Sequence, residues 1–243
     1  DWSSDVCSSD LSDLGYYYLC DNAGACSGST ATLANQVTNP VSLIEADASN
    51  GNVADNNGVV IMLPSVPATG ALSASGYLLL GIATRTNNTP ISTATTFKLD
   101  TSGDFKTKYN GSTIDGFIDS GSNGNYFPPT NTSLQVCVGD TTFYCPTGTM
   151  DLTAKQISAA LVSPTSQDIN FQVVNAISAF RSDNMVYATL AGYIGDNNSY
   201  WNVFDWGLPF YLGRAVYTGI DGKSATFNGS TVTGPYVTHH PQE

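Results

Sequence analysis

Short apolar runs separated by turn-forming residues recur along the chain, and this pattern constrains the fold more than any other feature. Residues 58–63 and 76–82 are continuous apolar runs of strand length with Pro and Gly between them, so we expect them to pair. Residues 95–99 and 105–109 alternate polar and apolar side chains, and an Asn-Gly turn leads from them to residues 116–119. These last three segments are predicted to form a β-meander.

The later part of the chain continues this pattern. Residues 137–145 are predicted to form a hairpin, and residues 169–174 and 185–190 two further strands. An aromatic-rich block follows from residue 201 to residue 217, whose rings are most simply explained as core side chains. The one predicted helix is short, at residues 31–44, and is interrupted by a proline.

Composition supports an all-β protein and excludes several partners. Charged residues make up only 12% of the chain, against 41% hydrophobic residues and 23 glycines, which is typical of secreted β-sandwiches and barrels. The net charge of -12 would repel a phosphate backbone, so nucleic acid is excluded as a partner. No apolar run reaches the roughly 18 residues of a membrane span. We therefore expect no nucleic acid and no membrane span.

We interpret residues 1–11 as an artefact, because this stretch equals one reading frame of a common sequencing adapter. A natural Ser-rich tail is the alternative. Under the adapter interpretation the true N-terminus and any signal peptide are missing, and Cys7 has no partner.

Four cysteines then remain, and they form two close pairs. Cys20 with Cys26 and Cys137 with Cys145 are predicted to be local disulfides. Zinc is the competing interpretation, but both spacings are wider than those of zinc sites and no histidine is near either pair.

Asp119 is the best-marked candidate for chemistry, because it ends an apolar strand and is followed by Ser120-Gly121-Ser122. Glycine lets a backbone N–H face the carboxylate, and hydroxyls can fix its oxygens. Where two such loops meet, the two carboxylates share one proton and act as acid and base toward water. The alternative is a plain polar turn.

Residues 116–122 resemble the active-site loop of pepsin-like aspartic peptidases. Residues 207–212 and 216–221 are similar to that family's later Gly-Asp-x-Phe segment and the strand after it, and residues 76–82 to its Gly-x-Leu-x-x-Gly-Gly stretch. Leu208 stands where the family has Asp, which is a departure from the pattern.

The resemblance implies a role for each residue of the loop. Asp119 would be one member of a catalytic pair, and Ser120 would reach across to a partner loop. Gly121 would offer its backbone N–H, and Ser122 would hydrogen-bond to Asp119. The implied fold is a pepsin-like C-terminal lobe, at residues 90–243, preceded by a remnant of the N-terminal lobe and a linker at residues 12–89.

Nearly everything after residue 11 also resembles a family of uncharacterised exported bacterial proteins, a domain of unknown function. The shared stretches are residues 39–43, 117–124, 204–210 and 234–236. Full members carry an upstream lobe with its own Asp loop, which is absent here. Localisation would be periplasmic, cell-surface or extracellular.

We therefore expect a fragment of a secreted aspartic-peptidase-like protein that retains one of two Asp loops and is inactive alone. Its partners would be a peptide or protein substrate and the missing N-terminal lobe, without metal or cofactor. A non-catalytic exported β-rich binding or envelope protein is the alternative. His239 and His240 are expected in a solvated tail, and a glycosidase pair of Asp205 with Asp119 is the weakest hypothesis.

Overall fold

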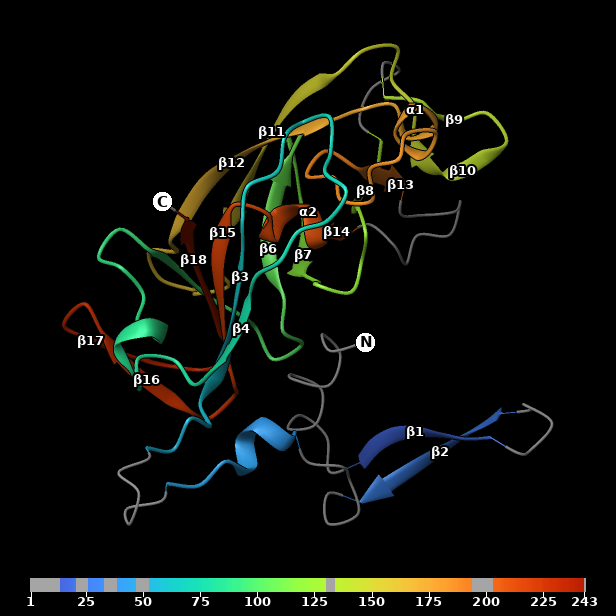
Figure 1. The fold of residues 1–243 in the computed structure, drawn as a ribbon. Coiled ribbons are helices and arrows are strands. Elements are labelled where there is room, and N and C mark those ends of the chain that lie inside the picture. The colour runs from blue at the N-terminus through green and yellow to red at the C-terminus, as the bar shows by residue number, and fades with distance from the viewer. Residues whose placement is uncertain are drawn as a thin grey trace.

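The computed structural model consists mostly of β-strands, so the predicted all-β class is confirmed (Figure 1). It describes residues 14–20, 26–32, 39–46, 53–129, 134–193 and 203–242. Two large sheets hold most of the strands. Two hairpins pair only with themselves: β1 (Leu14–Cys20) with β2 (Cys26–Thr32), and β16 (Ser224–Phe227) with β17 (Ser230–Thr233).

The larger sheet has nine strands in the order β12-β11-β6-β7-β14-β8-β13-β10-β9. In this sheet β14 lies between β7 and β8, which are neighbours in the sequence; it runs parallel to β7 and antiparallel to β8. The bounds are β6 (Phe105–Tyr109), β7 (Ser112–Ile118), β8 (Asn125–Phe127), β9 (Val136–Cys137), β10 (Asp140–Tyr144), β11 (Met150–Ile157), β12 (Ser166–Val173), β13 (Ala191–Tyr193) and β14 (Val203–Trp206).

The hairpin of β6 and β7 shows how local sequence builds this sheet. Phe105, Thr107 and Tyr109 are buried, while the two lysines between them are exposed, as alternation in a half-buried strand requires. Asn110 and Gly111 then have φ angles of 44° and 84°. Two consecutive positive φ values make the type I′ turn that suits the twist of a hairpin.

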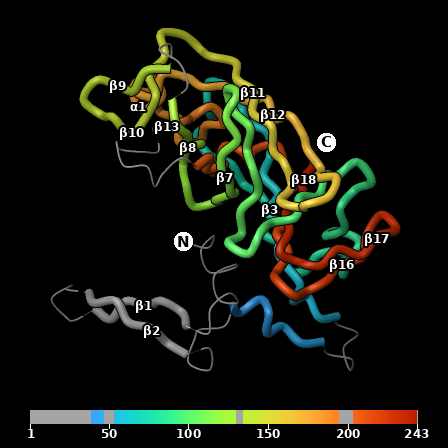
Figure 2. The backbone as a smooth tube through the Cα atoms, turned by 180° about the vertical axis from the view of Figure 1, so that it is seen from behind, coloured from blue at the N-terminus to red at the C-terminus, as the bar shows by residue number. Residues whose placement is uncertain are grey.

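The smaller sheet has five strands in the order β4-β3-β15-β18-β5. Figure 2 shows β3 and β18 of this sheet from behind. Its antiparallel β3–β4 pair confirms the predicted pairing of residues 58–63 with residues 76–82. Both strands precede the predicted boundary at residue 90, yet they share a sheet with later strands; the boundary itself stays a prediction. The bounds are β3 (Gly58–Leu63), β4 (Tyr77–Leu80), β5 (Thr95–Lys98), β15 (Arg214–Gly219) and β18 (Tyr236–Pro241).

One aromatic core joins the two sheets. Phe127, Phe204 and Trp206 of the nine-stranded sheet pack in the same cluster as Phe97 and Val237 of the five-stranded sheet. Phe204 stacks between Trp206 and Phe127, with ring centroids 4.2 and 4.8 Å apart. Each buried ring contributes about 1.5–3 kcal/mol by leaving water, so this cluster stabilises the contact between the two sheets.

Helices are few and short. The predicted helix at residues 31–44 is wrong at its start, where residues 31 and 32 belong to β2, and is helical at Pro40–Leu43; residues 33–38 lie outside the described part. Asn39 accepts a hydrogen bond from the backbone N–H of Val41 at 2.9 Å, so Pro40 begins the helix instead of interrupting it. The described helices are η2 (Pro40–Leu43), η4 (Thr86–Asn88), α1 (Ala176–Phe180) and α2 (Leu208–Tyr211).

Two strand predictions are also wrong. The meander is limited to β6 and β7, because β5 pairs with β18 in the other sheet, where Phe97 reaches the shared core. The run at residues 185–190 makes one bridge, between Val186 and Ala71, instead of a ladder. The Thr189 hydroxyl of that run donates to the Ala68 carbonyl at 3.2 Å, so isolated hydrogen bonds hold the run against the loop that contains Ala68.

His239 and His240 are buried in β18, so the expectation of a solvated tail is wrong. His239 is 2% exposed and stacks on Phe97, with centroids 5.3 Å apart. Its Nε2 lies 2.8 Å from Oε1 of Gln156. Burial, together with the positive charges of Arg214 and His240, lowers the pKa of His239 to about 3, so the ring is a neutral core side chain at neutral pH.

The disulfide between Cys137 and Cys145 is confirmed, with a Cα separation of 4.8 Å, and it closes the hairpin of β9 and β10. Cys20 and Cys26 lie opposite each other in the register of β1 and β2. Their side chains, and Cys7, lie outside the described residues.

Candidate functional site

The loop that carries Asp119 lies where β7 leaves the middle of the nine-stranded sheet. The backbone N–H of Asp119 donates to the Trp206 carbonyl at 2.9 Å, which extends the pairing of β7 with β14 by one bond. Three residues on, the Ser122 carbonyl accepts from the N–H of Leu208 at 2.7 Å. Both ends of the loop are therefore fixed to β14 and the start of α2.

Two groups of the same loop hold the carboxylate of Asp119. The backbone N–H of Gly121 donates to Oδ1 at 2.7 Å, and the Ser122 hydroxyl donates to Oδ2 at 2.7 Å. Each oxygen thus has one donor at the short distance typical of ionised acceptors. These are the two hydrogen bonds that the resemblance implies, and Asp119 itself is half-buried.

At Gly207, between β14 and α2, the backbone packs directly against the backbone that follows Asp119. A Cβ atom on Gly207 would lie 2.0 Å from the Gly124 carbonyl oxygen and 2.8 Å from that of Ser122. No side chain fits in that space, so glycine is required at this position.

Asp205 is the candidate residue whose position relative to Asp119 the sequence predicted least well. It pairs with Phe117 in parallel register, and Asp119 follows Phe117 by two residues, so strand alternation puts both carboxyls on one face of the sheet. Asp205 is 5% exposed, and its Oδ1 has no hydrogen-bond partner among the described residues. Burial and, to a lesser extent, the charge of Asp119 raise the pKa of Asp205 to about 7, against an opposing hydrogen bond with Ser122.

Ser122 therefore links the two carboxyls. A hydroxyl has one hydrogen, and Ser122 cannot donate it to both acids at once. While Ser122 donates to Asp119, Asp205 can bond to the serine oxygen only by donating a proton of its own. With the Ser122 hydrogen donated to Asp119, burial and the charge of Asp119 favour a protonated Asp205.

The sequence signal for Asp205 is its position inside the apolar run Phe204-Asp205-Trp206, where a charged residue needs a partner. Its proximity to Asp119 is not encoded locally, because it depends on β14 inserting beside β7. The hypothesis of a glycosidase pair fits poorly, since a sugar cannot lie between Asp119 and a carboxyl as buried as Asp205.

Ser120 lies next to Tyr211 of α2. Burial raises the pKa of the Tyr211 phenol, the charges of Asp119 and Asp205 raise it further, and a hydrogen bond with Ser120 lowers it. The structure thus places Ser120 against this chain's own helix α2. Its predicted contact with a partner loop stays a prediction.

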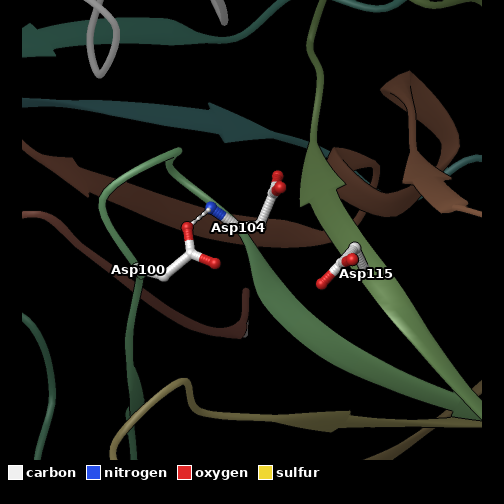
Figure 3. A group of neighbouring side chains, drawn as sticks. All are labelled: Asp100, Asp104 and Asp115. Atoms are coloured by element: carbon white, nitrogen blue, oxygen red, sulfur yellow. Dashed lines mark hydrogen bonds between the residues drawn. The ribbon is translucent and has the colours of Figure 1, made fainter. Parts of the chain in front are cut away.

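A second group of acids lies where the start of β6 passes the middle of β7. Asp100, Asp104 and Asp115 could bring three carboxylate oxygens to one cation, and they form the only such group among the described residues (Figure 3). Asp100, however, accepts the backbone N–H groups of Ser102 and Asp104, and Asp115 forms an ion pair with Lys106. Burial raises the pKa of Asp104 to about 6, and its acidic neighbours add to the rise. We assign no ion to this group.

No helix in the described part of the chain is long and apolar enough to cross a membrane. A family described as "Protein of unknown function (DUF3443)" has a model that matches residues 1–239. No curated protein matches the sequence.

Proposed function

We propose that this chain, which belongs to the DUF3443 family, carries one half of an aspartic-peptidase-type site in which Asp119 contacts the attacking water. The observation that supports this most is the fixation of both Asp119 oxygens by Gly121 and Ser122 at the end of β7. A half-buried carboxylate held in this way has a defined orientation and remains accessible to water.

The chemistry requires a second carboxylate. One carboxylate takes a proton from water as it attacks a peptide carbonyl, while the other, protonated, donates to the carbonyl oxygen. The sequence Asp-Ser/Thr-Gly occurs once in the chain, at Asp119, so the second loop would come from an upstream lobe. Asp205 is too buried to contact a substrate and is instead a positioning residue behind Asp119. The chain alone is therefore expected to be inactive.

The test is hydrolysis of an unfolded protein substrate between about pH 3 and 7 by the parent protein that includes the upstream lobe. Asp119→Asn is expected to lower kcat/KM by at least about 10³-fold, because an amide cannot exchange the proton. Asp183→Asn is the control, since Asp183 is exposed and remote in sequence from the loop. Activity that survives Asp119→Asn would overturn the proposal.

A folded parent without peptidase activity would favour the second candidate, a non-catalytic exported binding protein. The observation that supports this candidate is a cavity between the two sheets, described below. Export is proposed for either function, because the Cys137–Cys145 disulfide suits an oxidising compartment.

A further inference from the structure

A cavity of about 190 Å³ lies between the two sheets and takes no part in the proposed peptidase site. Its lining includes Phe171 of β12, Trp206 of β14, Phe210 of α2 and Arg214 of β15. Trp206 follows Asp205 in the strand, so alternation directs the indole to the face of β14 opposite Asp205 and Asp119. The cavity is thus a separate site on the other side of the same strand.

Arg214 brings a positive charge into this cavity, and no carboxylate of the described residues forms an ion pair with it. Its Nη1 donates to the Phe210 carbonyl at 2.7 Å, and its guanidinium lies over the Phe210 ring, 4.7 Å from the centroid. None of the three ion pairs formed by the described residues includes Arg214. A guanidinium has five N–H donors, so most of them remain available to an anion.

Asn125 provides the second polar group. It lines the same cavity from β8, is 2% exposed, and its Oδ1 has no hydrogen-bond partner in the part of the chain that the structure describes. Buried carbonyl oxygens of this kind nearly always have a donor, and leaving one without a donor destabilises the fold. An N–H or O–H group of a ligand would satisfy it.

The rest of the lining includes three aromatic residues, Phe171, Trp206 and Phe210, among aliphatic and polar side chains. Trp206 and Phe210 are almost fully buried, and Phe171 packs edge-on against Trp206 with centroids 5.7 Å apart. A dry protein cavity of about 150 Å³ is large enough for benzene. The volume here therefore accommodates one aromatic ring with small polar substituents.

We propose that this cavity binds a small aromatic carboxylate with an additional O–H or N–H donor. The carboxylate pairs with Arg214, the donor bonds to Oδ1 of Asn125, and the ring packs against the partly exposed Phe171 beside Phe210. The proposal is independent of the peptidase site, since the Trp206 carbonyl accepts from the Asp119 N–H while the Trp206 indole lies on the opposite face of β14.

The test is calorimetric titration of the purified chain with 3- and 4-hydroxybenzoate, benzoate and phenol. We expect at least one hydroxybenzoate to bind, benzoate to bind about 5-fold more weakly for lack of the donor, and phenol at least about 10-fold more weakly for lack of the anion. Equal binding of phenol and hydroxybenzoate, or no binding of any probe up to about 10 mM, would overturn the proposal.

Two variants separate the two contacts. Arg214→Gln is expected to abolish the preference for hydroxybenzoate over phenol, and Asn125→Leu the preference for hydroxybenzoate over benzoate. Arg181→Gln is the matched control, because Arg181 is exposed and outside the cavity, and it should leave all affinities unchanged.

If Arg214→Gln fails to fold, Arg214→Lys still tests the contact, since it keeps the charge but loses the planar donor pair and should weaken binding about 5-fold. Unchanged hydroxybenzoate binding in a folded Arg214 variant would contradict the proposed carboxylate contact.

Discussion

Asp205 is the side chain through which pH should act most directly on this fold. Its pKa in the folded protein is raised to about 7, while an unfolded chain would have the ordinary value of 3.8. A raised folded pKa means that the stabilising contribution is complete below the unfolded value and is lost as the pH rises through the folded value. Asp205 should therefore make the protein progressively less stable between about pH 4 and pH 7.

Asp205→Asn tests this expectation, because asparagine has nearly the shape of the protonated acid and cannot ionise. At pH 8 the variant should be more stable than the wild type, by up to about 4 kcal/mol, and near pH 4 the two should be similar. Urea unfolding at a series of pH values measures the difference. Asp183→Asn, at an exposed position, should leave the profile unchanged. A constant offset between Asp205→Asn and wild type would show that the acid is not protonated in the fold.

At the scale of elements, the junction of β14 and α2 depends on a residue without a side chain. Gly207→Ala would place a methyl group 2.0 Å from the Gly124 carbonyl oxygen, so β14 or the Asp119 loop must move. We expect a loss of about 2–4 kcal/mol in the free energy of unfolding, as for other forced overpacking. Gly148→Ala is the control, since its Cβ would have no atom within 4 Å, and it should change stability by less than about 0.5 kcal/mol. Equal effects of the two substitutions would contradict the close approach.

The elements that the sequence predicts well are those determined by their own residues. β3 follows from a continuous apolar run, and the β6–β7 hairpin from alternation around Asn110-Gly111. Strand pairings that depend on contacts between distant residues cannot be predicted in this way. For example, β5 pairs with β18 because Phe97 completes a core shared by both sheets. The hydrogen bonds within the Asp119 loop are local and were anticipated, whereas the position of Asp205 depends on a strand inserted from far along the chain.

At the scale of the whole molecule, the five-stranded sheet joins residues on both sides of the predicted boundary at residue 90. β3 lies between β4 and β15, and Val60 of β3 and Ile82 are fully buried against Ala215 and Tyr217 of β15. Removing β3 would expose this face and one edge of β15 to water.

A chain shortened to residues 90–243 is therefore expected to lose its cooperative thermal transition and to bind an apolar dye. A chain that begins at residue 39 is the control: it loses only residues 1–38, in which the described strands β1 and β2 pair with each other alone, and should keep the transition. Circular dichroism during heating measures both. A cooperative transition in the 90–243 chain would show that the later residues fold without β3.

The insertion of β14 between β7 and β8 also has a consequence for the order of events during synthesis. β7 and β8 leave the ribosome well before β14, yet neither can complete its hydrogen bonds until residues 203–206 have emerged. The centre of the nine-stranded sheet must therefore stay open in the nascent chain, with two unpaired strand edges. Contacts between residues so far apart form slowly, and open edges favour association with other chains. Productive folding of the nine-stranded sheet should thus wait for residues 203–206, with the closing of the sheet around β14 as its slow step.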